Sequence, residues 1–180
     1  MSKLTPEDMR QALKRGAEIR NRYFYDETDP VSALHDGASD AEILDLEASI
    51  GYQLPPSYRL FLSISNGWDF VDAHVSLISS HDIKNSFENK EFAKWYDDME
   101  KHGLDYPKNV VVIGTSDITE AKYLLVVPDV NAGKKEFELF SEEWPVMYLS
   151  ASSDFVYKDF WDFLNKSEEM YKELVEDEDL

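Results

Sequence analysis

A series of helix start and stop signals between residues 39 and 67 constrains the fold of this chain more than any other feature. Ser39 and Glu42 stand three positions apart, the spacing of a capping box at the start of a helix. Apolar residues then recur on one helical face: Ile43, Leu46 and Ile50. Gly51 follows, where a helix ends in a left-handed residue that glycine adopts without strain. The pattern predicts a short amphipathic helix that stops at Gly51.

A second helix is predicted directly after this glycine. Pro55 and Pro56 are both tolerated in a first helical turn, and either can start it. Its apolar face is supplied by Tyr58, Phe61 and Leu62, with Leu60 and Ile64 widening the stripe. Asn66-Gly67 is a strong stop signal. Residues 39–67 are therefore expected to form a helical hairpin.

Beyond the hairpin, the hydrophobic period changes from helical to alternating. Short apolar or alternating runs predict strands at 74–79, 110–114, 123–127, 135–140 and 145–150. A polar helix is expected over 88–102, and an amphipathic helix is expected in the C-terminal segment that begins at Asp154. Strands joined by short turns favour an antiparallel arrangement. The predicted class is α+β: a mainly antiparallel sheet of four to six strands, flanked by the N-terminal helical hairpin and the C-terminal helix.

The segment before the hairpin differs in charge from the rest of the chain. Residues 1–25 hold six bases and three acids, for a net charge of +3, and a helix is expected to start near Pro6 with Thr5 as its cap. The whole chain of 180 residues has a net charge of −19, which leaves −22 for the remainder. We therefore divide the chain into a basic N-terminal helical arm (1–25), a linker (26–38), a main domain (39–175) and an acidic tail (176–180).

The acidic composition limits the classes of partner. A strongly negative body repels nucleic acid and anionic membranes, and it attracts basic proteins. The chain has no cysteine, which excludes disulfides, cysteine nucleophiles and thiolate metal sites. No signal peptide and no membrane-spanning run is evident, so a soluble, cytoplasmic protein is expected. The alternative is that the negative charge only keeps the protein soluble.

The hairpin carries a spaced motif that resembles the signature of the SUKH superfamily. The matching residues are Glu47, Gly51, Leu54, Pro55, Tyr58, Phe61, Leu62, Asn66 and Gly67. Later segments are similar too: the runs at 110–114, 123–127 and 145–148, and the "DFWDFL" of the closing helix. The likeness spans residue 39 to about 165. The chain departs from the family at 115–121, where a turn with Gly-Asp is usual.

The resemblance implies a non-enzymatic binding domain. Most bacterial members resemble immunity proteins, which bind and neutralise a cognate toxin domain, and many such toxins are nucleases with basic clefts. The expected partner is then a basic toxin domain that the chain occludes. The alternative is a regulatory scaffold of the same family that binds a host signalling partner, with the N-terminal arm as its docking element. The motif residues themselves are expected to be structural, because glycine, proline and asparagine also occur at the ends of ordinary helices.

No group of residues in this sequence has the spacing of an established catalytic or metal-binding motif. Asp72, His74, His81 and Asp82 match no compact metal-ligand spacing. A Ser-His-Asp triad lacks a supporting nucleophile elbow, and the stretch at 129–140 departs from a calcium loop at two positions. We expect no catalytic residue, no metal, no cofactor and no small-molecule substrate.

Two stretches pair aromatic residues with carboxylates, the composition of an interface with anchors and a charged surround. The first is Trp68, Asp69 and Asp72; the second is Trp95, Asp97, Asp98, Glu100 and Asp105. These eight residues are the candidate partner-binding set. Trp68 and Trp95 have an alternative interpretation as core residues, because large aromatic side chains are mostly buried.

Overall fold

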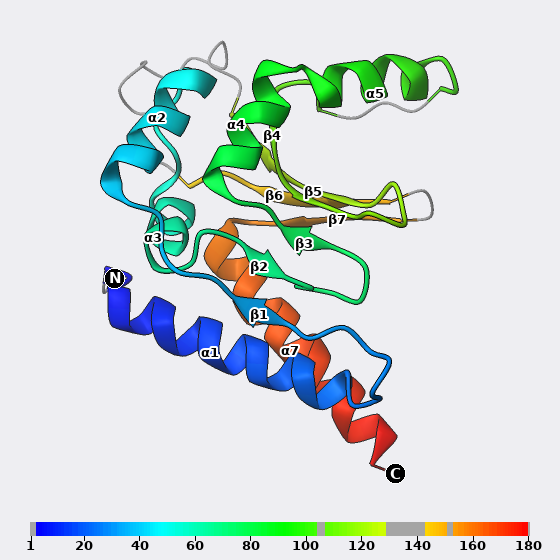
Figure 1. The fold of residues 1–180 in the computed structure, drawn as a ribbon. Coiled ribbons are helices and arrows are strands. Elements are labelled where there is room, and N and C mark those ends of the chain that lie inside the picture. The colour runs from blue at the N-terminus through cyan, green and yellow to red at the C-terminus, as the bar shows by residue number, and fades with distance from the viewer. Residues whose placement is uncertain (1–2, 104–106, 129–142, 151–152, 180) are drawn as a thin grey trace.

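The computed structural model describes residues 3–103, 107–128, 143–150 and 153–179, and it is an α+β fold (Figure 1). Its elements in chain order are α1 (Pro6–Tyr23), β1 (Ala33–Leu34), α2 (Asp40–Ile50), α3 (Pro56–Ile64), β2 (Trp68–Asp69), β3 (Ser76–Leu77), α4 (Ser80–Glu88), α5 (Glu91–Glu100), β4 (Val110–Thr115), β5 (Lys122–Val126), β6 (Val146–Leu149), β7 (Asp154–Tyr157) and α7 (Phe160–Glu178). The predicted fold class is confirmed. The described sheet has seven strands instead of four to six.

The predicted helical hairpin is present as α2 and α3. Ser39 and Glu42 form the capping box, with the Ser39 N–H donating to the Glu42 carboxylate at 2.8 Å. Gly51 ends α2 in the left-handed region with φ of +79°, and α3 begins at Pro56. Local capping chemistry thus fixes both ends of α2.

The strands form an antiparallel meander in chain order, so each strand pairs with its neighbour in sequence. The centre is the β4–β5 pair, whose register shifts between Val112 and Gly114 in a bulge. A Cβ on Gly114 would approach the Leu77 side chain and the Tyr123 Cβ to 3.1 Å, so this position favours glycine. The first three strands are only two residues long each.

Helices cover both faces of the sheet. One face packs against α1, α2, α3 and α7 in the main core, where strand residues such as Ile113 and Leu125 meet Phe61 and Phe160. The other face carries a smaller cluster, in which Phe92 and Tyr96 of α5 pack on β4, β5 and β6. In Figure 1, α5 lies above the sheet and α7 lies on its opposite side.

Helix α1 is packed onto the domain by a buried arginine. Arg20 is 1% exposed, and its guanidinium donates to the Val71 carbonyl (2.5 Å) and to the Ser167 hydroxyl on α7 (2.9 Å). Its Cζ lies 4.6 Å from the Trp68 ring centroid and 4.7 Å from that of Tyr171. Arg20 therefore joins α1, α7 and the loop after β2, and α1 lies alongside α7 (Figure 1).

Several predicted boundaries differ from the structure. The stretch at 26–38, predicted as a linker, contains β1, and the acidic tail is helical as far as Glu178. Helix α4 and strands β1, β2 and β7 were not predicted, and the C-terminal segment begins with β7, so α7 starts only at Phe160. The predicted strand at 135–140 lies outside the described residues.

Candidate protein-binding surfaces

Trp68, the first candidate anchor, belongs to the core. Its side chain is completely buried, and its indole N–H donates to the Ser32 hydroxyl at 2.8 Å. The ring lies under the Arg20 guanidinium, and a Cβ on Gly16 would come within 2.8 Å of it. The core interpretation therefore holds for Trp68, and this side chain is not available to a partner at the surface.

The two carboxylates beside Trp68 have different environments. Asp69 is half-exposed and lies 2.9 Å from Nε2 of His35. Asp72 accepts hydrogen bonds from the backbone N–H groups of His74 and Val75 at 2.8 Å each, and from the Tyr123 hydroxyl at 3.2 Å. Asp72 thus stabilises its own loop, whereas Asp69 is accessible.

The second candidate stretch lies on α5. Asp97, Asp98 and Glu100 are exposed, and two of these carboxylates have cationic neighbours: Asp98 is 3.1 Å from Lys101, and Glu100 is 2.9 Å from Lys108. Exposed pairs of this kind are worth little in stability and are easily exchanged for another cation. The α5 carboxylates therefore can accept basic groups of a partner.

Trp95 lies in the middle of α5 and is half-buried. Its ring centroid is 5.4 Å from that of Phe92, and Nζ of Lys122 lies 4.9 Å from it. Trp95 therefore contributes both to the small cluster on this sheet face and to the surface. Asp105 lies outside the described residues.

The two candidate stretches do not form one patch. Helix α5 packs over β4, β5 and β6, whereas Asp69 lies on β2, two strands before β4 in the sheet order. Figure 1 shows α5 and β2 on different parts of the molecule. We use the name α5 acidic face for the three exposed carboxylates around the C-terminal half of α5, Asp97, Asp98 and Glu100, together with Trp95, and we treat Asp69 separately.

The motif residues of the hairpin hold the corner together. The Glu47 carboxylate accepts from the Leu54 N–H at 3.0 Å and from Nε of Arg59 at 3.1 Å, which ties the end of α2 to the start of α3. The Asn66 side-chain oxygen accepts from the Ser80 N–H at 2.7 Å. Gly67 has φ of +114°. Leu54 and Tyr58 are buried, and Pro55 precedes α3 with φ of −60°. These contacts are structural.

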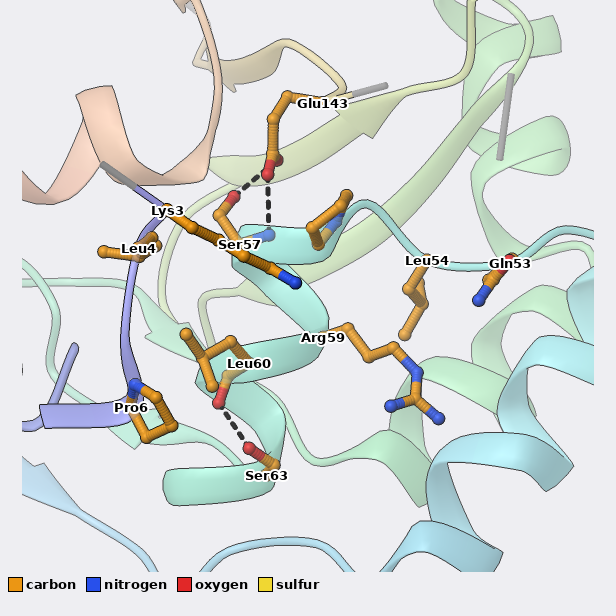
Figure 2. Close-up of a pocket in the computed structure, with 11 residues that line it drawn as sticks. Lys3, Leu4, Pro6, Gln53, Leu54, Ser57, Arg59, Leu60, Ser63 and Glu143 are labelled. Carbon is orange, nitrogen blue, oxygen red and sulfur yellow. Dashed lines mark hydrogen bonds between the residues drawn. The ribbon is translucent and has the colours of Figure 1, made fainter. Parts of the chain in front are cut away.

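A groove of about 490 Å³ opens beside α3 and was not anticipated from the sequence (Figure 2). At one end of it, the Glu143 carboxylate accepts from the Ser57 N–H at 2.8 Å and from the Ser57 hydroxyl at 2.6 Å. Pro55 has no side-chain group to cap α3, so Glu143 satisfies a donor at this helix start. Burial raises the pKa of Glu143, and the bonds from Ser57 oppose that shift. The rest of the groove is lined by Lys3, Leu4, Pro6, Gln53, Leu54, Pro56, Arg59, Leu60 and Ser63.

The side chains considered as metal ligands serve the local fold. Asp72 organises its loop as described above. Ser79 caps α4 by accepting from the Asp82 N–H at 3.2 Å, and its hydroxyl donates to the Asp82 carboxylate at 2.7 Å. Within the described ranges, no three His, Asp or Glu side chains gather in a way that could hold a metal ion. Among the helices that the structure describes, none is long and apolar enough to cross a membrane.

Fold and charge together define an acidic α+β domain built on a capped helical hairpin and an antiparallel meander. Residues 37–166 match the model of the SMI1/KNR4 family (SUKH-1), and the chain belongs to this family. Its members are generally immunity or regulatory proteins that bind protein partners. A comparison with curated proteins gives no significant match. Helix α1 and the last part of α7 lie outside the matched residues, although they pack on the domain.

Proposed function

We propose that this protein is an immunity protein that binds a cognate toxin domain in the cytoplasm and neutralises it by occlusion, without turnover. The observation that carries the proposal is a family fold whose net charge is −19. The toxin domain is inferred to be basic and of the nuclease class. Nuclease clefts bind phosphates, and protein carboxylates can occupy the same positions through charge-assisted hydrogen bonds.

The α5 acidic face is the surface that we assign to this contact. It presents three exposed carboxylates on one short helix, and Trp95 supplies an aromatic group next to them. Central aromatic anchors and surrounding charges are the usual arrangement of strong interfaces. Asp69 adds a separate acidic position, whereas Trp68 is excluded from the assignment by its burial.

The test is co-expression with a toxin domain encoded by a neighbouring gene, followed by co-purification and by rescue of growth. We expect a stoichiometric complex and full protection. Failure of the chain to bind or to protect against any neighbouring toxin contradicts the proposal.

A matched pair of variants tests the α5 face. Asp97→Asn with Asp98→Asn removes two charges from α5, and we expect weaker binding by about tenfold or more. Glu169→Gln with Glu173→Gln removes two exposed charges from α7 and changes the net charge equally. Equal losses from both double variants would show that the binding responds to net charge and not to this face.

The regulatory alternative depends on an N-terminal arm that can dock a partner. Met9, Leu13 and Arg20 of α1 are buried against the domain, so only the polar face of this helix is exposed. A solitary gene with no toxin beside it would favour regulation, and an adjacent toxin gene favours immunity.

A further inference from the structure

The last strand of the described sheet has an open edge. Strand β7 pairs with β6 on one side, and within the described residues no strand follows it in the sheet order. Asp154, Phe155 and Val156 are exposed, and among the described strands none pairs with the outer side of β7. The opposite edge is β1, which is only two residues long.

The hydrogen-bond pattern shows which backbone groups of β7 face outward. The Ser150 N–H donates to the Ser153 carbonyl at 2.9 Å, which makes this a hydrogen-bonded pair. Such pairs alternate with non-hydrogen-bonded pairs along an antiparallel ladder. Phe155 and Tyr157 therefore direct their N–H and C=O groups toward β6, opposite Tyr148 and Val146. The N–H and C=O groups of Asp154 and Val156 point away from the sheet.

The side chains of β7 suit the addition of another strand. Phe155 is 57% exposed and Val156 is 64% exposed, on opposite faces. Val156 lies beside the buried Met147 in the β6 register, and the Phe155 ring centroid is 6.2 Å from that of Tyr148. Natural edges are usually protected by lysine, proline or a bulge. The four residues of β7 include no lysine or proline, and the β6–β7 register has no shift.

Charge identifies the kind of strand that fits. A second copy would bring another net charge of −19 against this edge, which opposes self-pairing. A basic strand is attracted to the body as a whole, and a lysine or arginine opposite Asp154 forms a favourable cross-strand pair. Apolar residues on the new strand can pack beside Val156 and Phe155.

We propose that the β7 edge binds an extended, basic strand of the partner protein, which adds an eighth strand to the sheet. The inference rests on the proposed function, because it takes the partner to be a basic protein. It assigns a second contact, separate from the α5 acidic face, in which main-chain hydrogen bonds supply the affinity.

The probes are decapeptides that need no knowledge of the partner. An alternating lysine–valine peptide supplies charge and strand-forming ability, and a glutamate–valine peptide reverses the charge. A lysine–proline peptide keeps the charge but favours polyproline II over a β-strand, because each proline ring fixes its φ. Binding is measured by fluorescence anisotropy, and amide hydrogen exchange is followed by NMR. We expect only the lysine–valine peptide to slow exchange at the amides of Asp154 and Val156.

Two variants of Val156 separate strand addition from general charge attraction. Val156→Pro removes an outward N–H, which a folded edge strand tolerates, and Val156→Lys places a repelling cation on the edge. Each should weaken the lysine–valine peptide by about tenfold. Val156→Pro loses one main-chain hydrogen bond and the valine packing contact, and Val156→Lys loses that contact and adds a repelling charge. Ile118→Lys is the matched control, because Ile118 is 73% exposed in the β4–β5 connection. It should change the affinity by less than about twofold.

The outcomes separate this inference from the proposed function. Slowed exchange elsewhere, or equal losses from Ile118→Lys and Val156→Lys, overturns the β7 assignment. A dimer that slows exchange at Val156 without any peptide overturns the choice of occupant. If a toxin domain binds both Val156 variants as tightly as the unchanged chain, the inference fails and the immunity function stands. If the toxin domain does not bind the unchanged chain, the proposed immunity function is refuted. The peptide experiment then still tests whether the β7 edge binds an added strand.

Discussion

Replacement of Arg20 by methionine tests how α1 is held on the domain. Methionine approximates the length of the arginine side chain but removes the charge and every donor. The variant loses hydrogen bonds to the carbonyls of Val71 and Gly16 and to the Ser167 hydroxyl, and it loses the guanidinium between the Trp68 and Tyr171 rings. The acceptors on Val71 and Ser167 are left buried.

The expected loss of stability follows from opposing contributions. Three hydrogen bonds from a charged donor contribute roughly 1.5–3 kcal/mol each. Two cation–π contacts add about 1–2 kcal/mol each. The desolvation of a buried charge, several kcal/mol, offsets much of this sum, and it also lowers the pKa of Arg20. The net loss expected is about 3 kcal/mol, similar to the cost of breaking a buried ion pair.

Urea denaturation measures this change as a lower midpoint with an unchanged slope. A fall in Tm of roughly 6–12 °C corresponds to the same loss for a domain of this size. Arg22→Met is the control, because Arg22 is an exposed base on the same helix and should shift stability by less than about 0.5 kcal/mol. A result for Arg20→Met as small as the control result would refute the reasoning.

Three further predictions follow from single features. Gly51→Ala should cost about 1–2 kcal/mol in thermal or urea unfolding, because φ is +79° although the space around it is open; no loss would mean that the corner does not need a left-handed residue. Burial alone would raise the pKa of Glu168, but Lys172 and Arg15 lower it below its ordinary 4.5. The stability from this group is therefore present above pH 4.5 and is lost as the pH falls through the lowered pKa. Glu168→Gln should be less stable at pH 7 and should lose less on acidification, and parallel stability–pH curves would contradict this. The association rate with a basic toxin should fall as salt rises from 50 to 500 mM, by about tenfold or more in stopped flow; an unchanged rate would exclude electrostatic steering.

The parts of the fold that the sequence predicted well are those specified by neighbouring residues. The α2–α3 hairpin is an example, because Ser39, Glu42 and Gly51 act within a few positions of one another. Strands β1, β2 and β3 have two residues each, too few to show a period, and their pairing depends on the rest of the sheet. The sequence pattern alone places β7 in the closing helix, because the aromatic residues of β7 continue directly into the apolar pattern of α7.

For the candidate surface, only the residue composition could be predicted from the sequence. The exposed carboxylates of α5 could be recognised from the sequence because they lie on one short polar helix. The burial of Trp68 could not, since it depends on Ser32 and Arg20, which lie far away along the chain. The contact between Glu143 and Ser57 spans 86 positions and has no local signal. Charge and motif spacing are local, whereas burial and partner choice are set by tertiary packing.

The contact between α1 and α7 has a consequence for synthesis in the cell. Helix α1 leaves the ribosome before α7, and its partners Ser167 and Tyr171 are translated more than a hundred residues after Arg20. At roughly 5–20 residues per second, the 147 positions from Arg20 to Ser167 take about 7–30 seconds, and the part of α1 that packs on α7 stays uncovered for that time. During that interval the nascent chain is a substrate for chaperones and proteases, and completion of the C-terminal helix ends this exposure.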